Sequence, residues 1–237
     1  MQALILAGGK GTRLRPYTVS LPKPLVPVGD RPIAEILIRQ LREHGFREIV
    51  ISIGHLAELV EAYFGDGRRW GLRVRYVRED KPLGTAGPLR LAQGLDRDFL
   101  VLNGDVLTDA DFSGMMRAHK AKKAAATIGV SRREVKIDFG IIRMDGGSRF
   151  AEYVEKPSYE HHVSMGINVF NRRVRRHIRP GEALGIPDLV ERVHHAGERV
   201  ECHVHAGRWL DIGRIEDFQK AQDLFEKDGR KLLPPAP

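Results

Sequence analysis

The chain has 237 residues, of which 42% are hydrophobic and 30% charged, which suits a globular protein with one full core rather than two full-sized domains. Its formal net charge is +8, but the basic residues are scattered without a block or interleaved aromatic residues, so we expect no nucleic-acid partner. No apolar run approaches the roughly 20 residues that span a bilayer, and the first run is too short for a signal peptide. Cys202 is the only cysteine, which agrees with a reducing compartment. These features predict a cytoplasmic protein without a membrane partner.

The first half of the chain alternates short apolar runs with helical patterns. Strands are predicted at residues 2–7, 47–53, 72–79 and 98–105, and helices at residues 32–45, 55–67 and 85–95. Pro32 suits the first turn of a helix and Gly45 suits its end. Because strand-helix-strand units cross over with one hand, this series predicts an α/β fold with a Rossmann-like, doubly wound and mainly parallel sheet.

The second half is richer in strands. Strands are predicted at residues 124–130, 139–144, 149–156, 163–170 and 200–213, and helices at residues 186–197 and 215–229. These strands predict a mixed sheet with a small antiparallel layer added to it. We expect one domain over residues 1–228 and a C-terminal tail over residues 229–237, in which "KLLPPAP" cannot continue the last helix.

A glycine-rich loop follows the first predicted strand, in the stretch "LILAGGKGTRLRPYTVSLPKPLVPVG". Gly9-Lys10-Gly11 is not followed by the third glycine that a dinucleotide-binding fingerprint needs, and Pro16 comes soon after. Lys10 is followed by Gly11 and not by Ser or Thr, so the phosphate loop of ATPases is also excluded. A simple glycine turn with a proline-rich connector stays open as an alternative.

The remaining interpretation is a loop whose backbone N–H groups approach phosphate, because loops that leave the first strand of an open parallel sheet lie at its ligand-binding edge. Arg13 would supply a planar, permanently charged group and Lys23 a compact point charge. Prolines 22, 24 and 27 stiffen the segment that carries Lys23 and so limit the entropy lost when it holds an anion.

The stretch "LAGGKGTRLRPYTVSLPKPLVPV" resembles the signature of the sugar-1-phosphate nucleotidyltransferases, G-G-x-G-T-R-L-x-P-x-T followed by P-K-P-L. The resemblance implies an enzyme that takes a nucleoside triphosphate and a sugar-1-phosphate, with Arg13 and Lys23 as its catalytic cations. The nucleotide-binding residues that it implies are Leu6, Ala7, Gly8, Gly9, Gly11, Thr12, Glu79, Gly84 and Thr85. It is also compatible with a homo-oligomer, since dimers and tetramers are common among members.

Two aspartates follow predicted strands, Asp105 in "VLNGDV" and Asp211 in "RWLDIG". Either one alone would suit a helix cap or a turn. Two carboxylates at strand ends can also converge on Mg²⁺, which prefers oxygen ligands and substrate phosphates. Because both motifs resemble the metal-binding motifs of the family and occur in the same order, we expect Asp105 and Asp211 to hold Mg²⁺.

Three further residues are assigned only by the resemblance. "YVEKP" gives Glu155 for the sugar hydroxyls and Lys156 for the sugar phosphate, and "FGII" gives Gly140 for a hydroxyl through its backbone. A carboxylate suits hydroxyl donors, and an ammonium group suits a phosphate. Without the family, Glu155 and Lys156 would be an ordinary surface pair. The antiparallel layer is therefore expected to bind the sugar.

"REDKPLGTAG" resembles the base-recognition loop of the family, with Gly84 reaching the base through its main chain. Thymidylyl- and uridylyltransferases typically have glutamine where this chain has Glu79. An ionised glutamate only accepts hydrogen bonds and matches the two adjacent donors of guanine, so GTP is favoured and mannose-1-phosphate guanylyltransferase-like members are the nearest expectation. UTP, TTP or CTP with a glucose- or muramate-type sugar phosphate stays open, as do a solvated loop position for Glu79 and a noncatalytic nucleotide-sugar sensor.

The chain departs from the family pattern in two places. Many guanylyl- and thymidylyltransferases have Asn-Ala-Gly or a similar triplet beside the sugar, and this chain has Ser164-Met165-Gly166, which leaves the sugar open. The sequence also stops without a C-terminal β-helix, so acyltransferase activity and an allosteric domain are not expected. Histidines such as His203 and His205 lack the spacing and carboxylate company of a zinc site.

Overall fold

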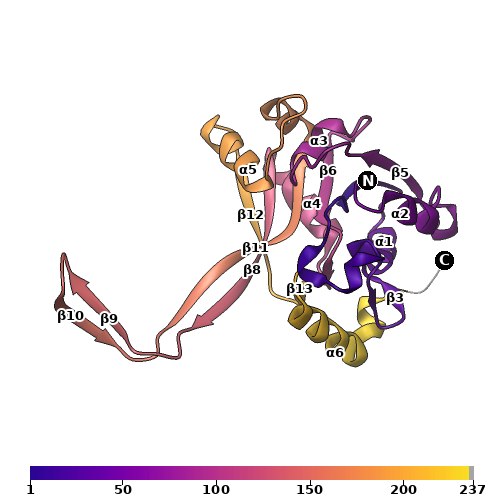
Figure 1. Ribbon diagram of the computed structural model, residues 1–237. Coiled ribbons are helices and arrows are strands. Elements are labelled where there is room, and N and C mark those ends of the chain that lie inside the picture. The colour runs from indigo at the N-terminus through magenta and orange to yellow at the C-terminus, as the bar shows by residue number, and fades with distance from the viewer. Residues whose placement is uncertain (235–237) are drawn as a thin grey trace.

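The computed structural model of the chain describes residues 1–234, apart from the side chains of residues 230 and 231. The strands of its main sheet are β1 (Gln2–Leu6), β4 (Glu48–Ile53), β5 (Arg73–Arg78), β6 (Asp98–Asn103), β8 (Ala126–Lys136), β11 (Ser158–Asn171) and β12 (Val200–His205). They lie in the order β12-β8-β11-β6-β1-β4-β5 (Figure 1). Only β11 is antiparallel to its neighbours in this sheet. The predicted mixed, mainly parallel sheet is confirmed.

Helices cover both faces of this sheet. They are α1 (Ile33–Glu43), α2 (Ala57–Phe64), α3 (Gly87–Leu91), α4 (Phe112–Lys122), α5 (Ile186–His195) and α6 (Ile215–Leu232). Because side chains alternate along a strand, Ala3 and Ile5 of β1 share one apolar cluster with α1, α2 and α4, whereas Leu4 shares another with α3 and α5. This arrangement is the doubly wound fold expected from the sequence.

Within residues 1–234, three small antiparallel sheets accompany the main one. They are β2 (Pro27–Val28) with β3 (Arg31–Pro32), β7 (Val106–Thr108) with β13 (Trp209–Asp211), and β9 (Ile141–Asp145) with β10 (Arg149–Val154). The β9–β10 pair forms the tip of an arm that projects from the rest of the molecule, and the outer parts of β8 and β11 form its stalk (Figure 1). The antiparallel layer expected from the sequence thus takes the shape of an arm.

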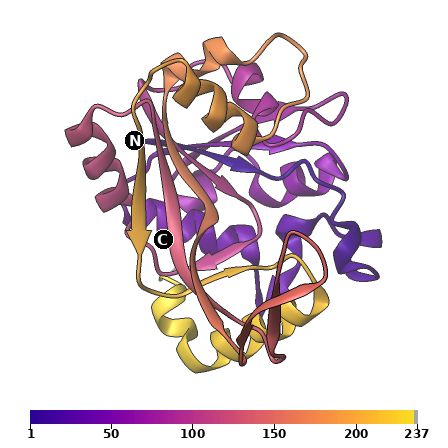
Figure 2. The same cartoon turned by 90° about the vertical axis from the view of Figure 1, so that its left-hand side faces the viewer.

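The last helix packs below the main sheet, at the opposite end from α5 (Figures 1 and 2). α6 continues to Leu232, so the domain boundary expected at residue 228 falls within a helix and the expectation that "KLLPPAP" cannot be helical is wrong for residues 231 and 232. The reason is burial: Leu232 is fully buried, and its carbonyl accepts a hydrogen bond from Nε2 of Gln40 at 2.8 Å. Residues 235–237 of the expected tail lie outside the described residues.

Among the helices of residues 1–234, none combines the length and the apolar character that crossing a bilayer requires.

Candidate active site

A cleft of about 340 Å³ lies where β1 and β6 end. These two strands are parallel neighbours, so the segments that follow them leave the sheet at the same edge. The order of the strands also reverses at β1, because β4 and β5 lie on one side of it and β6 on the other. Open α/β sheets bind ligands at such a point.

The cleft brings together most of the residues predicted from the sequence. It is lined by Leu6, Ala7, Gly8, Gly9, Gly11, Thr12, Arg13, Lys23, Pro24, Glu79, Thr85, Asn103, Gly104, Asp105 and Gly213. Of the predicted nucleotide-binding residues only Gly84 is missing from this lining. Gly84 has a φ of +71°, and a Cβ there would lie 2.4 Å from the carbonyl oxygen of Leu184, so its part in the structure is to let two loops approach.

The glycine-rich loop is wound by three short 3₁₀ turns, η1 (Thr12–Leu14), η2 (Tyr17–Val19) and η3 (Lys23–Leu25). Gly11 begins this path with a φ of +59°, and its carbonyl accepts a hydrogen bond from the hydroxyl of Thr18 at 2.8 Å. A Cβ at Gly11 would lie 3.2 Å from Cβ of Lys23. The loop therefore folds back on itself and holds the stem of Lys23 close to the glycines.

Lys23 forms an ion pair with Oδ2 of Asp105, and both side chains are only 15% exposed. This contact joins the glycine-rich loop to the segment after β6, which are more than eighty positions apart in the sequence. Oδ1 of Asp105 is buried and has no hydrogen-bond partner among the described residues. A buried carboxylate oxygen without a donor is costly unless another positive group reaches it, so it marks a place for a cation.

Asp211 reaches the same place because β13 pairs with β7. Asp211 lies opposite Val106 in this pair, and the amide of Ile212 donates to the carbonyl oxygen of Asp105 at 3.0 Å. Loss of water around the Asp211 carboxyl and the charge of Asp105 raise the pKa of Asp211, although Lys23 and Arg13 act in the opposite direction. The two aspartates therefore repel each other.

This pair of carboxylates suits a hard divalent cation. The residues that the structure describes contain no group of three or more His, Cys, Asp or Glu side chains placed to hold a metal. Mg²⁺ does not need such a cage, because it commonly binds one or two carboxylates together with water and substrate phosphate oxygens. The free oxygen of Asp105 and the raised pKa of Asp211 fit that donor set.

Glu79 is held at the wall of the cleft by two donors. Its Oε1 accepts a hydrogen bond from the hydroxyl of Ser52 at 2.7 Å, and its Oε2 accepts one from the amide of Leu83 at 3.0 Å. A Cβ at Gly8 would lie 2.5 Å from Oε1 of Glu79, so glycine is required for this close approach. Each carboxylate oxygen keeps a second lone pair for a ligand.

A second cavity of about 500 Å³ adjoins the cleft and shares Thr85 and Asn103 with it. Its lining residues are Thr85, Asn103, Ile128, Ser164, Met165, Gly166, Asn168, Ile186, Pro187, Val190, Glu191, Trp209 and Asp211. Asp211 lines this second cavity, and the described lining contains acidic side chains but no Lys or Arg. The lining itself therefore supplies no cationic side chain to an anion, and the cations that act on Asp211 are Lys23 and Arg13 outside it.

The profile of a family described as nucleotidyl transferase matches residues 2–228. The chain belongs to the nucleotidyl transferase family. A UTP–glucose-1-phosphate uridylyltransferase of Synechocystis is 34% identical over 93% of the chain, and the chain spans 62% of that relative's length. A mannose-1-phosphate guanylyltransferase catalytic subunit beta of Danio rerio is 32% identical over 99% of the chain and 67% of its own length.

Solved structures agree with this assignment. The nucleotidyl transferase chain superposes on a Bacillus anthracis protein described as a glucose-1-phosphate thymidylyltransferase, which was crystallised with sucrose. The TM-score is 0.76, the sequence identity is 26%, and the match covers 94% of each chain. The sequence and the fold therefore lead to the same family that the glycine-rich motif resembles.

Three predicted residues of this nucleotidyl transferase lie away from both cavities. Gly140 lies beside β9, and Glu155 and Lys156 follow β10, so all three belong to the projecting arm (Figure 1). In the described part of the chain they line neither the cleft nor the second cavity. The structure thus separates the predicted sugar-phosphate residues from the predicted nucleotide residues.

Sequence reasoning missed Asn103 and Trp209 of the second cavity in this nucleotidyl transferase, whereas the triplet Ser164-Met165-Gly166, expected beside the sugar, does line it. A Cβ at Gly166, which has a φ of +69°, would lie 2.5 Å from the side-chain nitrogen of Asn103, so a glycine is required for Asn103 to lie there. Trp209 donates from Nε1 to the carbonyl of Met165 at 2.9 Å and forms another wall. Asn103 stands directly before Gly104 and Asp105, and Trp209 stands two residues before Asp211, which is the signal that was available.

Proposed function

We propose that the chain transfers a nucleoside monophosphate from a nucleoside triphosphate to a sugar-1-phosphate and releases pyrophosphate. GTP and mannose-1-phosphate or a related sugar phosphate are the favoured substrates. The observation that carries the proposal is the presence of Arg13, Lys23 and Asp105 in a nucleotide-sized cleft, with Asp211 of the adjoining cavity close enough for their charges to act on it. Membership of the nucleotidyl transferase family supports it.

The nucleotide would lie in the cleft with its phosphates on the glycine-rich loop. Backbone N–H groups near Gly9 and Gly11 offer donors to phosphate oxygens, and Arg13 offers a charged fork to the departing pyrophosphate. Lys23 would neutralise charge around the reacting phosphorus. Its ion pair with Asp105 keeps the ammonium group in place before the substrates arrive.

The reaction needs two polyanions to approach each other. An oxygen of the sugar phosphate attacks the α-phosphorus, a new P–O bond forms, and the bond from that phosphorus to the pyrophosphate oxygen breaks. A phosphate monoester is already a competent nucleophile at neutral pH, so the chain does not have to supply a general base. Its residues align the two substrates and offset their repulsion.

Asp105 and Asp211 are the proposed holders of Mg²⁺. Once bound, Mg²⁺ would neutralise phosphate charge and help to orient the two phosphates. The free Oδ1 of Asp105 and the repulsion between the two carboxyl groups support this assignment. The proposed sugar-phosphate residues are Glu155, Lys156 and Gly140. All three lie on the arm, so the arm has to reach a sugar-phosphate site for them to act.

The same chemistry with another base is the second candidate. The relative from Synechocystis that matches the chain at 34% identity is described as a uridylyltransferase, so UTP with a glucose-type sugar phosphate is kept beside GTP. Glu79 favours GTP, because its carboxylate accepts two hydrogen bonds from the guanine edge.

The cytoplasmic location expected from the lone cysteine also stays a prediction.

The experiment is a screen for pyrophosphate release. The common triphosphates are combined with a panel of sugar-1-phosphates in the presence of Mg²⁺, and release above background with one pair supports the proposal. Lys23→Ala and Asp105→Ala should each reduce the rate about a hundredfold or more, because each removes a preorganised charge.

The matched control for Lys23 is Lys10→Ala. Lys10 lies on the same loop but is exposed and outside the cleft lining, so its removal should leave the rate near that of the wild type. A near-normal rate in Lys23→Ala would contradict its assigned role. If no triphosphate releases pyrophosphate with any sugar phosphate, the proposal fails and a noncatalytic sensor of nucleotide-sugars becomes the better interpretation.

A further inference from the structure

The arm is the largest feature that the proposed function does not explain. Its stalk is a continuous antiparallel ladder that runs from the pair Ser164–Val130 out to the pair Ser158–Lys136, and β9 and β10 form its tip. Figure 1 shows this arm leaving the sheet beside β13 and pointing away from all the helices.

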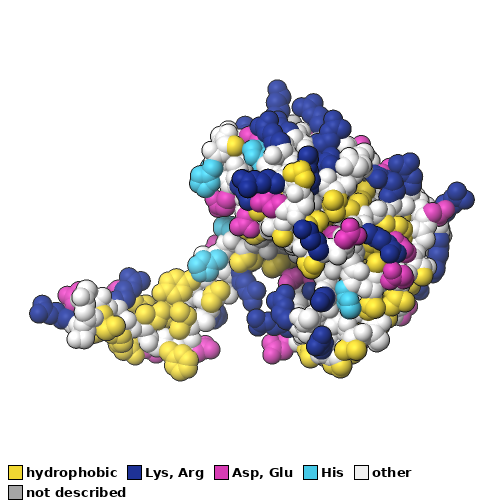
Figure 3. Space-filling model, turned by 45° about the horizontal axis from the view of Figure 1, so that its top comes forward, with side chains coloured by type: hydrophobic (Ala, Val, Ile, Leu, Met, Phe, Trp, Pro, Cys, Tyr) yellow, Lys and Arg dark blue, Asp and Glu magenta, His cyan; other side chains and the backbone are white. Residues whose placement is uncertain are grey.

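The arm is unusually apolar for a projecting hairpin. Its exposed apolar side chains are Val135, Phe139, Ile142, Met144, Phe150 and Tyr153, with exposed fractions between 43% and 77%. In the space-filling view, hydrophobic side chains gather along the arm (Figure 3). A two-stranded hairpin has little stability of its own in water, and contiguous exposed apolar surface of this kind marks an interface.

The arm cannot deliver Lys156 to the cavity of its own chain. Ser164 lines the second cavity, and the ladder from Ser164 to Ser158 alone is about 20 Å long at the usual rise of a strand. A bend near Gly166 is opposed, because β12 pairs with β8 as far as Ser131 and holds the base of the stalk from the other side. The direction of the arm is therefore set by the main sheet.

The second cavity lacks what the arm carries. Asp211 and Glu191 line it, and none of its described lining residues is a Lys or Arg, so beyond the Mg²⁺ proposed at Asp211 the lining offers a sugar phosphate no cationic side chain. Lys156 carries a cation and has a φ of +41°, a conformation that is uncommon outside glycine and tends to occur at functional positions. The charges of the arm and of the cavity are thus complementary.

An apolar patch beside the cleft matches the arm. Tyr17, Val19 and Leu21 of the glycine-rich loop are 45%, 66% and 38% exposed, and Ile215 at the start of α6 is 49% exposed. Tyr17 packs on Phe218 of α6 with 5.2 Å between ring centroids, so the loop and the helix form one surface. This surface borders Arg13 and the segment after Asp211.

We propose that two copies of this chain exchange their arms, so that Lys156 and Glu155 of each copy complete the sugar-phosphate end of the other copy's site. The apolar side chains of the arm then cover the patch of Tyr17, Val19, Leu21 and Ile215. A two-fold arrangement forms both contacts twice and closes without further copies. The inference rests on the proposed function, since it assigns Lys156 to the phosphate of that substrate.

The decisive test is a mixed dimer. One chain carries Lys23→Ala with an intact arm, and the other carries Lys156→Asn with an intact cleft; asparagine tolerates a positive φ, so the loop is kept. Two affinity tags isolate the mixed dimer after co-expression. If arms are exchanged, one of its two sites has both an intact cleft and an intact arm, so the mixed dimer should release pyrophosphate at about half the wild-type rate.

The parent variants define the baseline for this test. The Lys23→Ala homodimer should be about a hundredfold or more slower than the wild type, and the Lys156→Asn homodimer at least about tenfold slower. A mixed dimer as slow as its two parents would overturn the exchange while leaving the proposed function intact. A Lys156→Asn homodimer with the wild-type rate would also overturn it.

A second measurement does not depend on activity. Sedimentation should show the wild type as a dimer, and the double substitution Phe139→Ser with Phe150→Ser should shift it to a monomer with an unchanged circular dichroism spectrum. Arg149→Ser is the matched control, because Arg149 is an exposed polar residue of the same arm. A monomeric wild type would overturn the exchange, and this result stays readable even if no pyrophosphate is released.

Discussion

Glu79 is the residue on which the proposed choice of base depends. Ser52 and the amide of Leu83 fix its carboxylate, so the group is oriented before any base arrives. Glu79→Gln replaces one acceptor oxygen by an NH₂ donor, which faces the donors of guanine and suits a pyrimidine. We expect the ratio of kcat/KM for GTP to that for UTP to fall about tenfold or more, since a lost charge-assisted hydrogen bond costs about 1.5–3 kcal/mol.

The control for this variant is Asp80→Asn. Asp80 is the exposed neighbour of Glu79 in the same loop and does not line the cleft, so the ratio should not change. An unchanged ratio in Glu79→Gln would show that the base is selected by other groups.

Asp211 illustrates how a site residue acts against stability. Its raised pKa means that the native state binds this proton more tightly than the unfolded state, whose carboxyl has the ordinary value of 3.8. The stability contributed by the protonated form is present below that value and is lost as the pH rises through the folded pKa. At neutral pH the ionised carboxylate therefore disfavours folding, as expected of a group placed for a cation.

Removing this charge should stabilise the free chain and destroy its activity. We expect Asp211→Asn to raise Tm at pH 7.5 by about 1–2 °C and to reduce pyrophosphate release about a hundredfold or more. Mg²⁺ with a nucleoside triphosphate should raise Tm of the wild type and have a much smaller effect on the variant. Glu216→Gln, an exposed change in α6, is the control, and a lower Tm for Asp211→Asn would contradict this account.

At the scale of elements, the sequence predicts best where a strand is buried on both faces. The parallel strands β1, β4 and β6 have nearly continuous apolar runs, and the structure places them next to one another. The glycine-rich loop could also be predicted from the sequence, because glycine and proline set the backbone conformation locally. These elements account for the nucleotide side of the candidate site.

Helix α4 was not predicted, although its pattern was present. Phe112, Met115, Met116 and His119 recur at helical spacing and are buried, and Asp111 caps the helix by accepting from the amide of Gly114 at 2.8 Å. The basic and small residues between these positions weaken the apolar period, so local pattern reading passed over it.

The arm was hidden for a different reason. Beyond Val130 the side chains of β8 face no core on either side, so the sequence lacks the alternation that marks a strand. For this reason the predicted strand ended at residue 130, whereas β8 extends to Lys136. Cavity walls such as Asn103 and Trp209 were missed because their meeting depends on contacts between distant elements, which no local pattern encodes.

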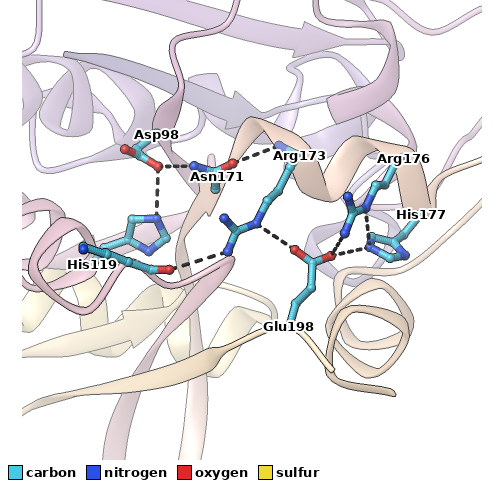
Figure 4. A network of polar contacts seen from close by, with 8 residues as sticks. Asp98, His119, Asn171, Arg173, Arg176, His177 and Glu198 are labelled. Atoms are coloured by element: carbon cyan, nitrogen blue, oxygen red, sulfur yellow. Dashed lines mark hydrogen bonds and ion pairs between the residues drawn. The ribbon is translucent and has the colours of Figure 1, made fainter. Parts of the chain in front are cut away.

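At the scale of the whole molecule, the end of the sheet opposite the cleft is held by a polar network (Figure 4). Its labelled members are Asp98, His119, Asn171, Arg173, Arg176, His177 and Glu198. They come from β6, α4, β11, η5 (Arg172–His177) and the turn before β12. Glu198 accepts hydrogen bonds from Arg173 at 2.7 Å and Arg176 at 2.9 Å. Asn171 accepts from the amide of Arg173 at 3.1 Å and donates to Asp98 at 2.7 Å, and Asp98 lies 3.4 Å from Nε2 of His119, so the network links five elements.

Two groups of this network make stability depend on pH in the same direction. Burial lowers the pKa of His119 despite the opposing charge of Asp98, so the fold disfavours the protonated imidazole. Burial alone would raise the pKa of Glu198, but hydrogen bonds from His177, Arg176 and Arg173 outweigh it and lower that pKa. In both cases the unfolded chain binds the proton more readily, so acid favours unfolding.

The two groups lose their contribution to stability in different pH ranges. The contribution of His119 is present above its ordinary pKa of 6.5 and is lost as the pH falls through its lower folded value, whereas that of Glu198 is lost only below 4.5. Between pH 7.5 and 5, His119 should therefore contribute to a falling Tm, and His119→Gln should reduce this fall by about 2 °C. Differential scanning calorimetry at several pH values measures this difference in Tm, with the exposed His195→Gln as control.

The loss of a contact lowers Tm of His119→Gln at every pH, because buried Nδ1 of His119 lies 2.8 Å from the hydroxyl of Thr127. The test is therefore the slope of Tm against pH and not Tm itself. An unchanged slope would mean that His119 has no part in the acid sensitivity of the fold.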